Sequence, residues 1–288
     1  MILARGPSDR RFLRVLAPVA AAALLSGCLT SGSTPAVQDE KAMAASPANI
    51  ASLTDVIQRN PNDPQAYNVR GTVLGRAGRH QEALADFSKA ISLDPNYAQA
   101  YANRGLVYRQ MKRFDLALAD YNRAIEIDPN YAAAYLGRGI VYRQEGQAMP
   151  ALADFNKAIA LRPDMAEAYY NRGLLYQAQK QHEFAIEDFT TARNLAPRQA
   201  EAITARGLSY IAINDFGAAA KDLDEAVQIE PQSLQAWTAR GLAYERLGDK
   251  EKAAGSYARA LTISQNYEPA RTGFARVGGR SGRVYQTF

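Results

Sequence analysis

Two histidines and one cysteine are the side chains in this 288-residue sequence best suited to metal, nucleophilic or acid–base chemistry. His80 and His182 stand three copies of a 34-residue repeat apart, each at a predicted turn between helices. At roughly 10 Å for each packed layer, about 30 Å separates them, so they cannot share a site. No phosphate-binding glycine loop, zinc cluster or nucleophile elbow accompanies them. The sequence therefore predicts no enzyme activity, no metal and no cofactor.

Cys28 stands in a different setting, at the end of an N-terminal leader. Four arginines precede a short apolar stretch at residues 15–25, which is shorter than the roughly 20 residues that span a bilayer. The segment Leu25-Ser26-Gly27-Cys28 follows, and it resembles the lipobox of bacterial lipoproteins. That resemblance implies removal of residues 1–27 as a lipoprotein signal peptide and lipidation of Cys28. An ordinary signal peptide with a chance cysteine is the alternative.

Lipidation at Cys28 would attach the chain to a membrane, since two or more acyl chains anchor stably. Residue 29 is leucine, not the aspartate that tends to retain such proteins in the inner membrane. The resemblance therefore implies a bacterial cell envelope location, with the periplasmic face of the outer membrane favoured over the inner membrane. Residues 28–48 are rich in Ser, Ala, Thr and Pro. We expect them to form a lipidated flexible tether with a mean reach of roughly 25 Å.

Much of the positive charge also lies in the leader. The formal net charge is +5, but residues 1–27 hold four arginines and one aspartate. Their removal would leave the rest of the chain close to neutrality. The basic composition is therefore no argument for a nucleic-acid partner.

Residues 64–267 consist of six uninterrupted copies of a 34-residue unit. Its positions 4, 8 and 11 share one helical face, and positions 20, 24 and 27 share another. Each unit is thus predicted to form two amphipathic helices. Glycine at position 8 costs roughly 1 kcal/mol relative to alanine inside a helix, and its recurrence in every copy indicates close packing. One such pair cannot bury its apolar face alone, so the copies must stack.

The pattern of a large side chain at 4, glycine at 8, alanine at 20 and 27 and proline at 32 resembles the tetratricopeptide repeat. This resemblance implies an all-α fold, a right-handed α-solenoid superhelix of antiparallel helix pairs. Its first helices would line a concave groove, and family members act mainly as protein–protein adaptors. We expect the solenoid to cover 49–277, with a partial cap at 49–63, six repeats at 64–267 and a capping helix at 268–277. A disordered tail would follow at 278–288.

Arginine occupies position 7 in all six copies, on the face predicted to be buried, and a buried charge requires a partner. Aspartate at position 23 of the first five copies supplies one, whereas the sixth copy has Ser256. We predict structural ion pairs within or between repeats; a row of ligand-binding arginines is the alternative. The expected partners are Arg70, Arg104, Arg138, Arg172 and Arg206 with Asp86, Asp120, Asp154, Asp188 and Asp222.

The tetratricopeptide resemblance also implies which side chains face the groove. Amides and arginines there would suit an extended peptide backbone or a carboxylate, although a plain solvated face is the alternative. The lysines with which the chaperone-binding class of this family holds peptide tails are absent. The expected partner-binding residues are Asn103, Arg109, Gln110, Arg143, Gln144, Tyr170, Asn171 and Gln177.

A lipobox combined with these repeats resembles two groups of lipoproteins. One is the NlpI type, which collects peptidoglycan hydrolases, and the other is the pilotin type, which helps to assemble secretins or type IV pili. The sequence therefore predicts a lipid-anchored scaffold whose groove holds an envelope protein or peptide. Direct binding of a small ligand or glycan is a third interpretation. The oligomeric state stays open.

Overall fold

The computed structural model describes residues 46–280 and 282–285, and this part of the chain is entirely helical apart from its connections. The predicted all-α solenoid is confirmed, since helices pack pairwise along the chain. Cys28, the signal peptide and most of the tether lie outside the described residues. The helices are α2 (Pro47–Arg59), α3 (Pro64–Arg76), α4 (His80–Leu93), α5 (Ala98–Gln110), α6 (Phe114–Ile127), α7 (Ala132–Gln144), α8 (Ala148–Leu161), α9 (Ala166–Ala178), α10 (His182–Leu195), α11 (Ala200–Ala212), α12 (Phe216–Ile229), α13 (Leu234–Leu247), α14 (Lys250–Ile263) and α15 (Glu268–Arg276).

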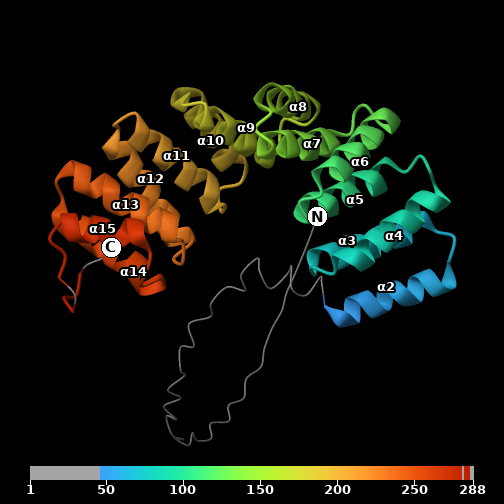
Figure 1. The fold of residues 1–288 in the computed structure, drawn as a ribbon, viewed down its shortest axis with the longest axis horizontal. Coiled ribbons are helices and arrows are strands. Elements are labelled where there is room, and N and C mark those ends of the chain that lie inside the picture. The colour runs from blue at the N-terminus through green and yellow to red at the C-terminus, as the bar shows by residue number, and fades with distance from the viewer. Residues whose placement is uncertain (1–45, 281, 286–288) are drawn as a thin grey trace, which may run out of the picture.

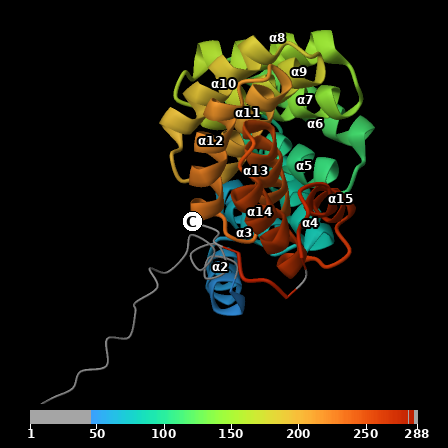
Figure 2. The same ribbon diagram turned by 90° about the vertical axis from the view of Figure 1, so that its left-hand side faces the viewer.

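Each repeat is one pair of helices, and the pairs follow one another along an arch from α2 to α15 (Figure 1). The second helix of each repeat packs against the first helix of the next. First helices of neighbouring repeats also contact each other, from α3 and α5 through to α13 and α15. This places the first helices on the inner side of the curve and the second helices outside. The quarter-turn view shows the central pairs at the top of the arch (Figure 2).

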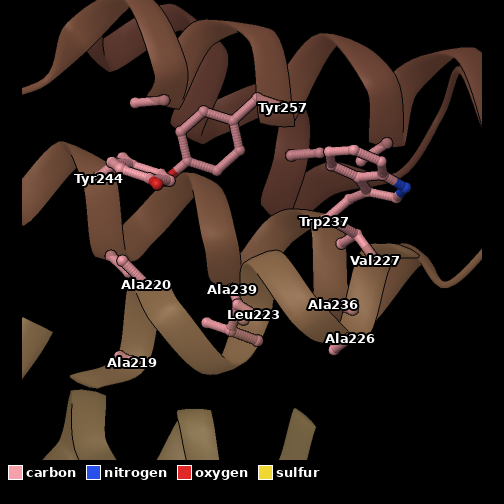
Figure 3. Packing of buried hydrophobic residues seen from close by; sticks show 14 of the residues in the cluster. Ala219, Ala220, Leu223, Ala226, Val227, Ala236, Trp237, Ala239, Tyr244 and Tyr257 are labelled. Carbon is pink, nitrogen blue, oxygen red and sulfur yellow. The ribbon is translucent and has the colours of Figure 1, made fainter. Parts of the chain in front are cut away.

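The glycine at position 8 of each repeat makes room for the side chain at position 24. A Cβ atom added at Gly139 would lie 2.8 Å from Cε1 of Phe155. The same addition at Gly241 would lie 2.6 Å from Cε1 of Tyr257. The ring therefore occupies the space that any larger residue would need, which explains the cost accepted at this position. Figure 3 shows Tyr257 and Trp237 filling the space between the last helices.

The turn inside every repeat contains one residue with left-handed backbone, always at position 15. Three copies have glycine there, and the others have Lys112, Lys180 and Asn214 with φ between 57° and 64°. Such a residue ends a helix by turning the chain back on itself. Non-glycine residues are uncommon in this conformation. Because only half of the copies have glycine at position 15, the sequence did not indicate which residue of the turn adopts it.

The two ends of the array have helices where the sequence predicts caps. Helix α2 starts two residues earlier than expected, with the Ser46 side chain accepting a hydrogen bond from the Asn49 amide at 3.3 Å. Helix α15 follows the sixth repeat as a seventh first helix. In the described part of the C-terminal tail, the Tyr285 ring centroid lies 5.7 Å from that of Phe274 on α15.

Candidate functional site

The arginines at position 7 form a ladder of ion pairs along the repeats. In the first five copies, Nε and Nη2 of the arginine each donate to one carboxylate oxygen of the position-23 aspartate, at 2.7 or 2.8 Å. The aspartates are 5% exposed. The hydrogen bond that Arg138 donates to Asp154 raises the pKa of Arg138 above its ordinary value. These pairs join the two helices of each repeat.

The third guanidinium nitrogen, Nη1, reaches across to the preceding repeat. It donates to the side chain at position 25 there, as in the 2.7 Å bond from Arg138 to Oδ1 of Asn122. In the sixth copy the charged and the uncharged partner exchange places. Arg240 donates to the carboxylate of Asp224, at position 25 of the preceding repeat, at 2.6 Å, and to the hydroxyl of Ser256, at position 23 of its own repeat, at 2.7 Å. Every arginine thus links three helices. With Nε, Nη1 and Nη2 all engaged inside the protein, the ladder has the geometry of structural ion pairs.

The large side chain at position 4 supports the ladder from the same helix. The Arg138 guanidinium carbon lies 5.6 Å from the ring centroid of Tyr135, one helical turn away, and Arg240 lies 5.5 Å from the Trp237 ring. Stacking of this kind adds roughly 0.5–1 kcal/mol at exposed sites. The Tyr135 hydroxyl also donates to the Pro129 carbonyl at 3.2 Å. The aromatic and proline positions of the repeat are therefore physically connected.

A cavity of about 1030 Å³ opens on the inner face of the arch. Its walls come from first helices α5, α7, α9 and α11 and from the connections that precede α11 and α13. Two smaller cavities, of about 130 Å³ and 150 Å³, adjoin it and share residues with it. Five of the predicted groove residues line the large cavity: Arg109, Arg143, Gln144, Tyr170 and Asn171.

The other three predicted groove residues lie elsewhere. Gln177 lines the cavity of about 130 Å³, and Asn103 lines the one of about 150 Å³. Both amides are already engaged, since Gln177 donates to Ser209 Oγ at 2.9 Å and Asn103 to Asn68 Oδ1 at 2.9 Å. Gln110 is exposed at the end of α5 and lines none of these three cavities. The structure therefore gathers five of the eight residues into one place.

Several lining residues were missed by sequence reasoning. Glu167 and Glu201 stand at position 2 of their repeats, which the family resemblance already placed on the groove, so a signal for them existed. Residues 196–199 and 229–232 approach because the curve brings successive connections toward the inner helices. The repeat pattern carried no signal for those connections.

The guanidinium groups of Arg109 and Arg143 dominate the electrostatics of one wall. Both stand at position 12, on α5 and α7, and the Nε atom of each is buried without a hydrogen-bond partner. Arg143 Nη2 donates to Asn171 Oδ1 at 3.2 Å, and Asn171 is itself held by the Glu167 carbonyl at 2.8 Å. Burial lowers the pKa of Arg143, and the charge of Arg109 lowers it further.

Tyr121 reaches the same wall from the outer helix α6. A Cβ atom at Gly137 would lie 2.4 Å from the Tyr121 ring, so glycine on α7 leaves the passage for this side chain. Burial raises the pKa of Tyr121 to about 12, although the neighbouring Arg109 guanidinium opposes that rise. Tyr121 and Arg109 both line the cavity of about 150 Å³. A neutral hydroxyl thus stands beside a guanidinium at the edge of the larger cavity.

The histidines do not take part in this site. His80 and His182 are the first residues of α4 and α10, so the expectation that they lie in turns was wrong by a small margin. Within residues 46–280 and 282–285, no group of three or more His, Cys, Asp or Glu side chains could hold a metal ion. Among the described helices, none combines the length and the apolar character that crossing a bilayer requires.

Comparison with solved structures places the fold among known helical repeat arrays. A chain of the APC/C hetero-tetramer Cut9–Hcn1 matches with a TM-score of 0.71 at 20% identity, covering 83% of this chain and 46% of that one. The pilF protein of Pseudomonas aeruginosa matches with a TM-score of 0.68 at 19% identity, covering 74% and 97%. MamA matches with a TM-score of 0.52 at 27% identity, covering 57% and 96%. Comparison with curated proteins gives no significant match.

Sequence families identify the repeats directly. Tetratricopeptide repeat families match residues 98–131 and 166–199, 120–153, and 204–268, and a TPR repeat family matches residues 74–112 and 141–180. Together these matches cover most of the helical array. Arrays of this kind are scaffolds for protein–protein interactions and are typically not enzymes. The chain belongs to the tetratricopeptide repeat family.

Proposed function

We propose that this protein is a lipid-anchored scaffold of the bacterial cell envelope that holds a segment of a partner protein against its inner face. The observation that carries the proposal is the cavity of about 1030 Å³ formed by four successive first helices. A site built from several repeats is long and open, which suits an extended segment better than a compact small molecule. Recruitment of peptidoglycan hydrolases is the role that we propose for it.

The lining of the cavity agrees with recognition of a peptide. Gln144 brings an amide group, Tyr170 brings a half-buried ring with a hydroxyl, and the arginines bring fixed positive charge. An extended peptide presents N–H and C=O groups along its whole length, and such amides can both donate and accept. The carboxylates of Glu201 and Glu230 also line the cavity. A partner segment of mixed charge would complement both.

Crosslinking in living cells tests the groove. A photoreactive phenylalanine analogue at Tyr170 should capture one partner, identified by mass spectrometry, whereas the same analogue at exposed Asn194 on outer helix α10 should not. A hydrolase among the products supports the proposed role, whereas a secretin or pilus subunit points to an assembly factor. Identical products from both positions, or none from Tyr170, would refute binding in the groove. Saturable binding of muropeptides by the purified chain would indicate a glycan ligand instead.

The envelope location depends on Cys28, which lies outside the described residues. We expect the wild-type chain to incorporate labelled fatty acid and to sediment with outer-membrane vesicles. Cys28→Ser should abolish labelling and release the protein from the membrane fraction. A Cys28→Ser chain that sediments like the wild type would contradict the anchor and leave the groove hypothesis untouched.

A further inference from the structure

We infer that Arg109 and Arg143 together form a subsite for a carboxylate group of the bound segment. This inference rests on the proposed function and makes it more specific. It names the chemical group on the partner and the place in the cavity where that group docks.

The first step is a contrast between two sets of arginines in the same protein. The arginines at position 7 in the first five repeats each donate from Nε, Nη1 and Nη2 to side chains of this chain, including a carboxylate. Arg109 and Arg143 are different, because their Nε atoms are buried without any partner. Among the ion pairs of the described residues, none involves Arg109 or Arg143. A buried donor left unsatisfied costs about 1–3 kcal/mol, and more for a charged group.

The second step is the placement of the two groups. Both arginines occupy position 12 of adjacent repeats, on the neighbouring helices α5 and α7, and both line the same cavity. The charge of Arg109 acts on Arg143 in the direction that disfavours a second cation. An anion between them would relieve that repulsion. Arginine binds carboxylate in a planar, two-bonded arrangement.

The third step is that neighbouring groups hold these arginines in position. Asn171 accepts from Arg143 Nη2 at 3.2 Å and is buried itself. Tyr121 stands beside Arg109, through the space that Gly137 leaves. A guanidinium held before the ligand arrives loses less conformational entropy on binding. Asn171 and Tyr121 are thus positioning residues for the subsite.

The fourth step concerns the charge of the ligand. Glu167 lines the same wall, and the Tyr170 hydroxyl lies under the opposing influences of Arg143 and Glu201. The cavity is thus lined by three guanidinium groups, those of Arg109, Arg143 and Arg198, and by the three carboxylates of Glu167, Glu201 and Glu230. Those carboxylates disfavour a dianion such as phosphate more than a single carboxylate. The carboxylate can come from an acidic side chain or from a free C-terminus of the partner.

Arginine side-chain NMR on the full chain, labelled with ¹⁵N on arginine, tests this directly. Three short probes are titrated: acetyl-tetra-alanine with a free C-terminus, acetyl-Ala-Ala-Asp-Ala amide, and acetyl-tetra-alanine amide without charge. We expect saturable shifts of the Arg109 and Arg143 Nε–H signals with at least one carboxylate probe, and none with the uncharged probe. The probe that acts identifies the source of the carboxylate.

Variants complete the test. Arg109→Gln and Arg143→Gln should each lower the affinity for the active carboxylate probe roughly 10- to 100-fold, as expected for loss of a charge-assisted hydrogen bond. Arg123→Gln, on outer helix α6 and outside the cavity, is the matched control and should bind like the wild type. If a Gln variant does not fold, Arg143→Lys keeps the charge, loses the planar fork and should bind more weakly than the wild type.

Two results would overturn the inference: no shift at either Nε–H with both carboxylate probes, or equal shifts with the uncharged probe. Stronger binding of inorganic phosphate than of either carboxylate probe would also overturn it. Partner capture at Tyr170 together with silent NMR titrations refutes only this subsite. Failure of that capture refutes the proposed function itself.

Discussion

Replacing Asp154 by alanine removes one rung of the arginine ladder and tests how much the ladder contributes. Asp154 is 5% exposed and accepts two hydrogen bonds of 2.8 Å from Arg138. Removing one member of a buried pair costs about 3–5 kcal/mol, because the other charge is left without compensation. The Arg138 side chain is 20% exposed and keeps Asn122 at 2.7 Å. We therefore expect the lower end of that range, about 3 kcal/mol.

Asp164→Ala is the matched control, since its carboxylate is 80% exposed and lies 3.7 Å from Arg162. An exposed pair of this kind contributes under about 1 kcal/mol. Urea unfolding followed by circular dichroism measures the total loss in each variant. Native-state hydrogen exchange locates it, because repeats interact only with their neighbours and the loss should centre on α7 and α8. The reasoning fails if Asp154→Ala lowers the free energy of unfolding by no more than Asp164→Ala does.

Three further outcomes follow from the packing and ionisation of particular side chains. Gly139→Ala should lower the free energy of unfolding by about 1–3 kcal/mol through overpacking. Gly75→Ala, whose Cβ would lie 3.4 Å from the nearest atom, should be neutral or stabilising. Equal urea midpoints for the two variants would contradict the packing argument. Asp224→Ala should lower the free energy of unfolding as much as Asp154→Ala does. The Asp224 side chain is 37% exposed, but its partner Arg240 is only 4% exposed and would be left without a carboxylate. A decrease as small as that for an exposed ion pair would refute this prediction. Burial raises the pKa of Tyr121 to about 12. The contribution of the Tyr121 hydroxyl to the free energy of unfolding is therefore complete below the ordinary tyrosine pKa of about 10 and is lost as pH rises through 12. The free energy of unfolding of Tyr121→Phe, measured between these two pH values, should lack this decrease.

Most of the fold could be predicted because its determinants repeat within the sequence. Glycine at position 8 and a ring at position 24 touch within one repeat, and so do the arginine and aspartate of positions 7 and 23. The exchange of roles in the last repeat also leaves a trace, since Asp224 stands at position 25, where the first four copies have uncharged polar residues. A second trace was overlooked: tyrosine at position 24 occurs where the next copy has glycine at position 6, as with Tyr121 and Gly137.

The candidate site could be predicted only in part, because it is not contained within one repeat. Gln110 and Gln144 occupy the same position of successive copies, yet only Gln144 lines the large cavity. The difference comes from the curvature of the array, which accumulates small rotations between neighbours and brings residues 196–199 toward the inner helices. No periodic pattern records that accumulation.

The sequence by itself determined the helix pairs and their stacking and indicated the aspartate partners of the first five ladder arginines, because those contacts recur at fixed spacings. The position-25 partners, including Asp224 for Arg240, came only from the structure. Only the tertiary structure decided which polar atoms of the groove are left without partners. Arg109 and Arg138 are both arginines on first helices, but one lacks a partner for its Nε atom and the other donates from Nε to a carboxylate. Hydrogen bonds form or fail over a few tenths of an ångström, and distances on that scale are set by the whole array.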